Sequence, residues 1–338
     1  RKGSADGDTM TDVLHQAEAV GTPRAALAGS FTIAPWLYLA PALVILFVWI
    51  YLPLIQAGEL SFYQWNMLPT STPRFVGLDN YRDIFGDDDF QLALRNTLWF
   101  SLGVVPTQTV LGLILAVLAN QKIRGRTFFR TAFYFPSISS SVVISIIFLW
   151  LYSQRGLINF VLGKMGFPTP QPPWLSNPRG VLEMALNGIG IDNVNVWLAG
   201  PSVALLSIMM MNIWTTMGTM MVVFLAGLQD IPTDVYEAAS MDGATRRQQF
   251  FHITVPLLRP VIFFVLTLGV IGTFQVFAQI FVMTSGGPAK STITLGYLIY
   301  QEGFGNFAMG YASAIAVVLF AMIMAIFLIQ RRIVGSNA

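Results

Sequence analysis

The sequence contains no cysteine among its 338 residues, and only 11% of its residues are charged. The lack of cysteine excludes disulfides and thiol chemistry. The fraction of charged residues lies well below the roughly 25% found in average soluble proteins. Apolar residues make up 54% of the chain, and that much apolar surface cannot all be buried in one soluble core. The formal net charge of +2 gives no reason to expect nucleic acid or another polyanion as a partner.

Catalytic and metal-binding patterns are also missing from the sequence. The two histidines, His15 and His252, are isolated, and no nucleophile lies next to a base. The segment Thr284–Thr292, TSGGPAKST, resembles a phosphate-binding loop only superficially, because it lacks the glycine before Lys290 and the required spacing. We therefore expect that the chain is not an enzyme and binds neither a metal nor a cofactor itself.

Six long runs without any charged residue dominate the chain. About 20 apolar residues suffice to cross a bilayer as a helix. The runs predict an all-α integral membrane protein with six transmembrane helices near residues 35–56, 96–120, 131–153, 203–226, 257–283 and 309–330. A membrane domain of residues 34–332 would then lie between polar tails at 1–33 and 333–338. Within it, Gly112 and Ala116 are spaced to let a neighbouring helix approach closely, and Pro136 is expected to bend the third span.

The distribution of lysine and arginine predicts the orientation of these spans. If both termini are cytoplasmic, the cytoplasmic segments hold twelve of the 19 basic residues, and the longer loops at 59–95 and 154–200 are extracytoplasmic. The positive-inside rule favours this arrangement. It places both termini and residues 229–256 in the cytoplasm.

The segment 229–256 is a charged island between two apolar runs. Thr233 or Asp234 is positioned to cap a helix, with Glu237 completing a capping box. Gly243 is expected to end that helix in the left-handed conformation. The residues from Ala244 to Thr254 form a second, amphipathic segment. We predict two short helices, exposed on one side of the membrane.

This island resembles the EAA loop of the permeases of binding-protein-dependent ABC importers. The residues in register with the family pattern are Glu237, Ala238, Ala239, Gly243, Ile253 and Pro256. Val255 replaces the usual leucine, and Asp242-Gly243-Ala244 matches the form found in sugar permeases. The resemblance implies the permease fold of type I importers and a place in the cell membrane of a bacterium or an archaeon. It also implies that Glu237, Ala238, Ala239, Ser240, Asp242, Gly243, Ile253 and Pro256 contact an ATPase.

The resemblance further implies a set of partners. One is a second, homologous permease subunit, because six spans are few for a pathway. The others are a dimer of ABC ATPase subunits, which would bind ATP and magnesium, and an extracytoplasmic substrate-binding protein. The chain itself would be surrounded by membrane lipid. In this reading the coupling helix around Glu237 to Gly243 seats in a cleft on the ATPase and transmits its closure to the spans.

Polar side chains in the fourth and fifth spans are candidates for a substrate path. Such side chains are costly at bilayer depth unless they are paired or face water, and amides beside aromatic rings suit a sugar. The candidates are Asn212, Trp214, Thr215, Thr216, Gly218, Phe274, Gln275 and Gln279. Thr215 and Thr216 could equally bond to their own helix backbone. Phe274-Gln275 aligns with a Phe-Asn pair that contributes to the sugar site in the maltose permease that this chain resembles.

The extracytoplasmic loops add three expectations. In the first, Phe75, Leu78, Tyr81, Ile84 and Phe85 recur at helical spacing and predict an amphipathic helix. Asp87-Asp88-Asp89 is expected to be a turn and helix cap rather than a cation site. In the second, an added stretch at residues 180–200 could contact a substrate-binding protein, or could equally pack on its own bundle.

The function predicted from these observations is the ATP-driven import of a sugar, by alternating access, as the permease subunit of an ABC importer. An importer of glycerol 3-phosphate or a polyol is the alternative substrate class. A secondary transporter is a further alternative, although the runs lack the internal repeat and the embedded charges expected of one. A structural or signalling membrane protein would need neither the polar spans nor the cytoplasmic helix pair.

Overall fold

The computed structural model describes residues 33–68, 71–121, 124–167, 173–191 and 194–334. The chain divides into two compact units, Arg1–Leu54 and Ile55–Ala338. The predicted tail 1–33 lies outside the described residues except for its last residue, and so does most of the tail 333–338.

The first unit holds the beginning of one apolar helical run. It consists of α2 (Ile33–Leu46), the π-helical turn η1 (Phe47–Tyr51) and the start of α3 (Leu52–Leu60). Pro35–Leu60 is helical throughout, with a mean hydropathy of 2.3, and it covers the predicted first span. Its length of 26 residues is sufficient to cross a bilayer.

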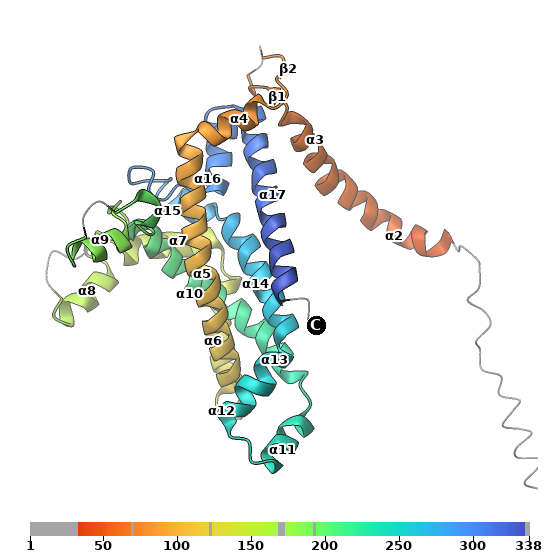
Figure 1. Cartoon of the computed structure of the whole chain (residues 1–338), viewed down its shortest axis with the longest axis vertical. Helices are drawn as coiled ribbons and strands as arrows, with labels where there is room; N and C mark the ends of the chain where they lie inside the picture. Colours follow the sequence, from red (N-terminus) through yellow and green to blue (C-terminus); the bar gives the residue numbers. More distant parts are fainter. Residues whose placement is uncertain (1–32, 69–70, 122–123, 168–172, 192–193, 335–338) are drawn as a thin grey trace, which may run out of the picture. The chain divides into compact units, whose positions relative to one another are not determined.

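The second unit is a helical bundle with one two-stranded sheet among its described residues (Figure 1). Strands β1 (Tyr63–Gln64) and β2 (Arg74–Phe75) pair antiparallel. The helices of its first half are α4 (Asp79–Gly86), α5 (Asp88–Asn120), α6 (Arg126–Ile138), α7 (Ser141–Leu151), α8 (Leu157–Lys164), α9 (Val181–Asn187) and η2 (Val196–Leu198). Those of its second half are α10 (Val203–Gln229), α11 (Thr233–Met241), α12 (Arg246–Gln249), η3 (Phe250–Thr254), α13 (Val255–Leu257), α14 (Arg259–Phe274), α15 (Ala278–Met283), α16 (Leu295–Tyr300), η4 (Gln301–Gly305) and α17 (Met309–Val334).

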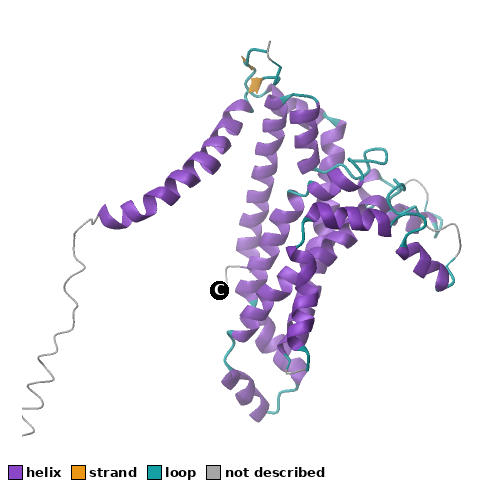
Figure 2. Ribbon diagram, turned by 180° about the vertical axis from the view of Figure 1, so that it is seen from behind, coloured by secondary structure: helices purple, strands orange, loops and turns teal. Residues whose placement is uncertain are grey.

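The long helices α5 and α10 form the centre of this bundle, with α14 against α5 and α6 against α10. Gly112 lies at the crossing of α5 and α10, where an added Cβ would come within 2.7 Å of the Met220 Cβ. This is the close approach that the small residues of the second run predict. Small side chains allow dispersion contacts along the helix backbones, which drive helix association in lipid. The long helices α5 and α17 run lengthwise through the bundle, with α11 and α12 at one end and α4 at the other (Figures 1 and 2).

Six spans were expected, with a bend in the third, and the structure differs from that expectation. Among the residues that the structure describes, four helices are long and apolar enough to cross a membrane alone, at Pro35–Leu60, Asp88–Asn120, Val203–Gln229 and Met309–Ile333. The third predicted span is bent by 98° between Arg126–Ile138 and Ser141–Leu151. The segments Arg246–Leu257 and Arg259–Phe274 meet at 66°. The fifth predicted span is also interrupted, because α14 ends at Phe274 and α15 begins at Ala278.

The break in the third span does not fall at the proline that was expected to cause it. Pro136 lies inside α6, and the helix continues to Ile138 before Ser139 takes an extended conformation. A proline removes one hydrogen bond from the preceding turn, which weakens the helix without ending it at that residue. The run of serines at 139–141 then separates α6 from α7.

The predicted amphipathic helix of the first loop is shorter than expected. Phe75 lies in β2 and Leu78 is the residue before α4, so only Tyr81, Ile84 and Phe85 are helical. Pairing of β2 with β1 takes Phe75 out of the helix. Asp87 caps α5, its side chain accepting a hydrogen bond from the Asp89 amide at 2.8 Å, as predicted. The acidic run therefore serves as a cap.

The added stretch 180–200 contacts its own bundle at the start of α5. The Trp99 indole donates to the Trp197 carbonyl at 3.1 Å, and the Arg95 guanidinium donates to the Val196 carbonyl at 3.1 Å. The stretch also closes on itself, since the Glu183 amide donates to the Ala199 carbonyl at 3.0 Å. These contacts agree with the interpretation of this stretch as a segment packed on the bundle.

Candidate functional site

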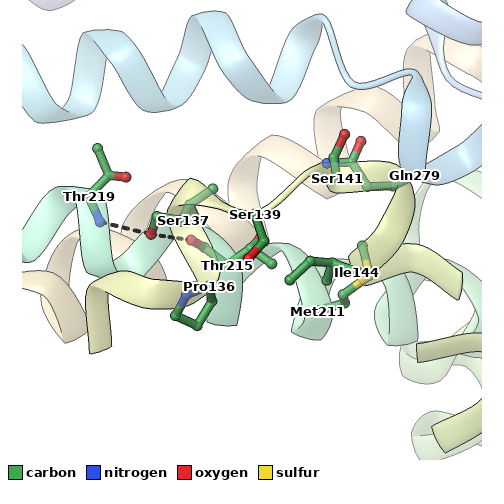
Figure 3. A pocket seen from close by; sticks show the side chains of 10 residues that line it. Pro136, Ser137, Ser139, Ser141, Ile144, Met211, Thr215, Thr219 and Gln279 are labelled. Atoms are coloured by element: carbon green, nitrogen blue, oxygen red, sulfur yellow. Dashed lines mark hydrogen bonds between the residues drawn. The ribbon is translucent and has the colours of Figure 1, made fainter. Parts of the chain in front are cut away.

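A polar hollow lies where α6 and α7 meet α10 (Figure 3). Its volume is about 170 Å³. The α6–α7 bend contributes Pro136, Ser137, Ser139, Ser141 and Ile144, α10 contributes Met211, Thr215, Thr216 and Thr219, and α15 contributes Gln279. Seven of these ten residues carry a hydroxyl or an amide in the side chain, and none of the lining residues is charged. The hollow is therefore suited to a neutral, hydroxylated molecule.

Ser137 joins α6 to α10 inside this hollow. Its hydroxyl donates to the Thr215 carbonyl at 2.6 Å and accepts from the Thr219 amide at 3.2 Å (Figure 3). A regular α-helix joins those two backbone groups to each other. A side chain inserted at this position is a known cause of helix distortion. The bend of the third span is thereby held directly against the middle of the fourth.

Two of the predicted path residues have a dual role here. The Thr215 hydroxyl donates to the Asn212 carbonyl of its own helix at 2.8 Å. The Thr216 hydroxyl does the same at 2.8 Å but also lies 2.5 Å from the Gln108 side-chain oxygen on α5. Bonding to the helix backbone, one of the two predicted alternatives, thus occurs at both residues, while both still line the hollow. Asn212 itself is buried, with 8% of its surface exposed.

The remaining path candidates are not all brought together. Gln279 lines the hollow. Gln275 is exposed at the break between α14 and α15. Phe274 is 1% exposed and packs in an apolar cluster with Ile84 and Phe90, so it lies in the core rather than in the hollow.

Trp214 and Gly218 lie on α10 outside the lining of the hollow. Trp214 packs against Phe148, with ring centroids 5.5 Å apart. At Gly218 an added Cβ would overlap the Phe133 carbonyl oxygen and come within 2.8 Å of the Ser137 Oγ. This glycine therefore permits the close approach of α6 to α10 that positions Ser137.

Sequence reasoning missed the contributions of the second and third spans to this site. Gln108 is 1% exposed and reaches Thr216 across the α5–α10 interface. Ser137, Ser139 and Ser141 supply hydroxyls from the bend. The signal was present in the sequence, since a glutamine and a cluster of serines within apolar runs are polar groups that need a partner in a membrane.

The segment 229–256, called the coupling segment below after the role expected for it, forms the two predicted short helices at one end of the bundle (Figure 1). Gly243 has φ of +79°, the left-handed conformation expected after α11. The predicted cap at the start of α11 is wrong, because Pro232 occupies the N-cap position and no side chain bonds there. A capping box is found instead at Thr245 and Gln248, where it starts α12.

The residues assigned to ATPase contact differ in their exposure. Glu237, Ala238, Ser240, Asp242 and Gly243 are exposed. Ala239, Ile253 and Pro256 are partly buried, on the side of the segment that faces the bundle. Sequence reasoning did not single out Met241, an apolar side chain that is 89% exposed at the end of α11.

Two side-chain hydrogen bonds tie α11 to the segment that leads into α14. The Tyr236 and Thr254 hydroxyls lie 2.9 Å apart. The Gln249 amide donates to the Ser240 hydroxyl at 2.9 Å. Thr254 is 5% exposed, so its bond with Tyr236 is sheltered from water. Buried hydrogen bonds hold their partners more firmly than exposed ones, because breaking them leaves a desolvated polar group unpaired.

These features define a multi-pass helical membrane protein with a polar internal hollow and an exposed helix pair at one end. The family described as "Binding-protein-dependent transport system inner membrane component" matches residues 108–336. The chain belongs to this family.

Individual relatives agree with the family assignment. The probable ABC transporter permease protein YurN of Bacillus subtilis is 35% identical, over 89% of this chain and 95% of its own length. The multiple sugar-binding transport system permease protein MsmF of Streptococcus mutans is 33% identical, over 85% of this chain and 90% of its own.

A solved structure shares the fold. A chain of the bacterial alginate ABC transporter, in complex with an alginate pentasaccharide-bound periplasmic protein, superposes with a TM-score of 0.71. The match covers 88% of this chain and 93% of that one at 21% sequence identity.

Proposed function

We propose that this chain is the permease subunit of an ATP-driven ABC importer and passes a neutral oligosaccharide across the cell membrane. The observation that carries the proposal is the uncharged hollow at the α6–α7 bend, where hydroxyl and amide groups alternate with apolar ones. A sugar offers the complementary surface, with many hydroxyls and apolar ring faces. The names of the relatives, among them a multiple sugar-binding transport system permease, support the same substrate class.

The absence of charge from the lining of the hollow separates two substrate classes. A phosphorylated polyol such as glycerol 3-phosphate would be favoured by an arginine or lysine, since phosphate binds most strongly to charged donors. The ten lining residues include neither. A neutral sugar needs only hydrogen bonds of the kind that Ser139, Thr216 and Gln279 can make.

Motion would enter the bundle through α11. In this proposal the exposed face of α11, with Glu237, Ala238 and Met241, seats on a cytoplasmic ATPase subunit, and both chain termini are cytoplasmic. Closure of the ATPase pair on ATP displaces α11. The bonds from Tyr236 to Thr254 and from Ser240 to Gln249 carry this displacement towards α14.

The hollow would respond through the contact of α10 with the bend. α11 follows α10 directly in the chain, with only Asp230–Pro232 between them. Because Ser137 is bonded to α10, a shift of that helix moves the end of α6 and changes the opening of the hollow. A second permease subunit would complete the pathway, and an extracytoplasmic binding protein would deliver the sugar.

The test is uptake into proteoliposomes that contain the chain with its partner permease, ATPase and binding protein. Radiolabelled neutral di- and oligosaccharides and glycerol 3-phosphate are offered separately, with ATP inside or outside the vesicles. We expect uptake of a neutral sugar that requires ATP on the side of α11. Uptake driven by an ion gradient without ATP, or of glycerol 3-phosphate alone, would contradict the proposal.

A further inference from the structure

A second hollow lies between α5 and α6, and it shares no residue with the polar one. Its volume is about 330 Å³. It is lined by Leu115, Leu118, Ala119, Gln121, Phe129 and Phe133, so that only one lining side chain is polar. Leu118 and Phe129 are 51% and 46% exposed, which means that the hollow opens on the surface of the bundle.

The hollow occupies the last two turns of α5. That helix is long and apolar enough to span a membrane, from Asp88 to Asn120. At about 1.5 Å per residue, Leu115 lies within roughly 10 Å of the end of the helix. The sequence is apolar through Leu118 and Ala119 and turns polar and basic from Asn120 to Arg126, which is the pattern expected where a span leaves the lipid chains and enters the headgroups.

An arginine is fixed at the lip of this hollow. Arg130 donates from Nε and Nη2 to the Ala119 carbonyl, at 3.3 and 2.9 Å. Ala119 lines the hollow, and its carbonyl belongs to the last turn of α5, where helix carbonyls lack partners within the helix. A guanidinium has five N–H donors. The bonds to Ala119 leave donors that can bind an anion at the same place.

Further positive charge surrounds this position. Arg124 and Arg126 are exposed in the turn that leads into α6. Arg126 is seven residues before Phe133, which puts the two on nearly the same face of the helix. Both ion pairs among the described residues lie elsewhere, at Arg82 with Asp79 and Lys290 with Asp89. The three arginines around the hollow are therefore not neutralised by a carboxylate of the described chain.

We propose that this hollow is a binding site for an anionic phospholipid. One acyl chain lies between Phe129, Phe133 and Leu118, and the phosphate is held by Arg126 and Arg130. Two observations lead to this ligand. The walls are apolar and open on the surface near the end of a helix long enough to span a membrane, and the positive charge at the lip has no carboxylate partner among the described residues. Basic residues at the end of a transmembrane helix attract anionic headgroups.

Neither the apolar walls nor the arginines would be enough by themselves to indicate an anionic phospholipid. An apolar surface in a membrane contacts any lipid, and an exposed arginine contacts any anion. Their combination distinguishes a phosphatidylglycerol from a phosphatidylcholine with the same chains, because only the first has a net negative headgroup. A lipid held in this position would brace α6 against α5.

Native mass spectrometry of the purified transporter complex provides the test. The complex in detergent is titrated with dioleoyl phosphatidylglycerol or dioleoyl phosphatidylcholine, and retained lipids are counted. We expect preferential retention of phosphatidylglycerol. Arg126→Gln should weaken it about fivefold, the effect of one basic residue near a membrane surface. Leu118→Trp, which fills the hollow, should abolish it.

Two variants serve as matched controls. Arg331→Gln removes an exposed positive charge near the end of α17, and Phe128→Trp enlarges a neighbouring exposed side chain that does not line the hollow. Neither should change lipid retention. Equal retention of the two lipids, or unchanged retention in Leu118→Trp, would overturn the proposal.

A cross-linking experiment identifies the occupant directly. Because the chain contains no cysteine, Leu118→Cys gives a single site for a benzophenone label. After irradiation in vesicles of phosphatidylglycerol and phosphatidylcholine, the adduct is identified by its mass. An adduct enriched in phosphatidylglycerol supports the lipid site. An adduct with another subunit of the transporter shows that the hollow is a protein interface and refutes it.

Discussion

The hydroxyl of Tyr236 lies 2.9 Å from the hydroxyl of Thr254, which joins α11 to the segment that runs into α14. The two residues are 18 positions apart, on either side of the turn at Gly243. A small hollow lined by Tyr236, Thr254 and Leu228 lies beside the bond, so the packing around it is incomplete. The hydrogen bond is therefore a main link between the two halves of the coupling segment.

Removal of this bond is expected to uncouple ATP hydrolysis from transport. Tyr236→Phe keeps the ring and deletes the hydroxyl, which leaves the buried Thr254 hydroxyl with a weaker set of partners. A loss of about 1 kcal/mol is typical for such a bond. We expect uptake to fall about fivefold while ATP hydrolysis by the reconstituted complex changes less than twofold. Tyr134→Phe, at an exposed tyrosine of α6, is the control. Equal losses of uptake and hydrolysis would instead indicate defective assembly.

The exposed face of α11 is expected to be essential for uptake and dispensable for folding. Glu237→Lys reverses a charge on a side chain that is exposed and has no described hydrogen bond, and Gly243→Asp forces a side chain into a left-handed conformation. For most residues other than glycine, the left-handed conformation costs about 1–2 kcal/mol of conformational free energy. We expect both variants to insert normally in membranes but to show no uptake and reduced co-purification of the ATPase. Glu183→Lys on α9 is the control. Normal uptake in either coupling variant would contradict the proposed docking.

Met241 offers a more specific probe of the same surface. Its side chain is 89% exposed, so its replacement does not disturb the core of this chain. Met241→Asp should weaken the affinity between the permease and the ATPase more than tenfold if the side chain inserts in a cleft, because burial of a charge without a partner is costly. The thermal stability of the isolated permease should stay unchanged. The affinity is measured by pull-down of the ATPase at several concentrations, and an unaltered affinity would show that Met241 lies outside the interface.

The contact between the bend and α10 is expected to control substrate passage. Ser137→Ala deletes a hydroxyl that makes two hydrogen bonds, at a cost of about 1–2 kcal/mol. Gly218→Val places a side chain against Phe133 and should be more severe. We expect Ser137→Ala to change the maximal rate of uptake several-fold and Gly218→Val to abolish uptake. Ser153→Ala, on an exposed serine after α7, should have no effect. Wild-type kinetics in Ser137→Ala would exclude the bend from the rate-limiting motion.

The ion pair of Lys290 with Asp89 predicts a pH dependence at the opposite end of the bundle. The hydrogen bonds that the Lys290 ammonium donates to the Asp89 carboxylate raise the pKa of Lys290, and the negative charge of Asp89 acts in the same direction. A raised pKa in the folded state means that the stabilisation is complete below the unfolded value of about 10.4 and is lost as the pH rises through the folded value.

Because Lys290 is largely exposed, its contribution should stay below about 1 kcal/mol and weaken with salt. Thermal unfolding between pH 8 and pH 11.5 should therefore show a small alkaline loss of stability that Lys290→Met lacks. The variant should be less stable than the wild type at pH 8 and should approach it at the alkaline limit. A constant difference between the two proteins across this range would show that the pair does not titrate.

The coupling segment shows how far local sequence reasoning reaches. The position of the two helices and the left-handed glycine at 243 follow from the chain itself, since turn residues act over three or four positions. The start of α11 was not predicted correctly. Pro232 and Asp234 both suit the first turn of a helix, and only the path of the chain out of α10 decided that Pro232 takes the cap position.

The sequence by itself determined which stretches are apolar enough to enter a membrane and where a charged helix pair interrupts them. These properties depend on residues that are close in the chain. The sequence also named Thr215, Thr216 and Gln279 as polar candidates, but only the tertiary structure decided that they line one hollow with the serines of the α6–α7 bend. Thr216 meets Gln108 from 108 positions away, and Ser137 meets Thr215 from 78 positions away. Whether a buried hydroxyl bonds to its own helix or to a neighbour depends on how closely two helices approach, and that distance is set by packing across the bundle, which no short stretch of sequence encodes.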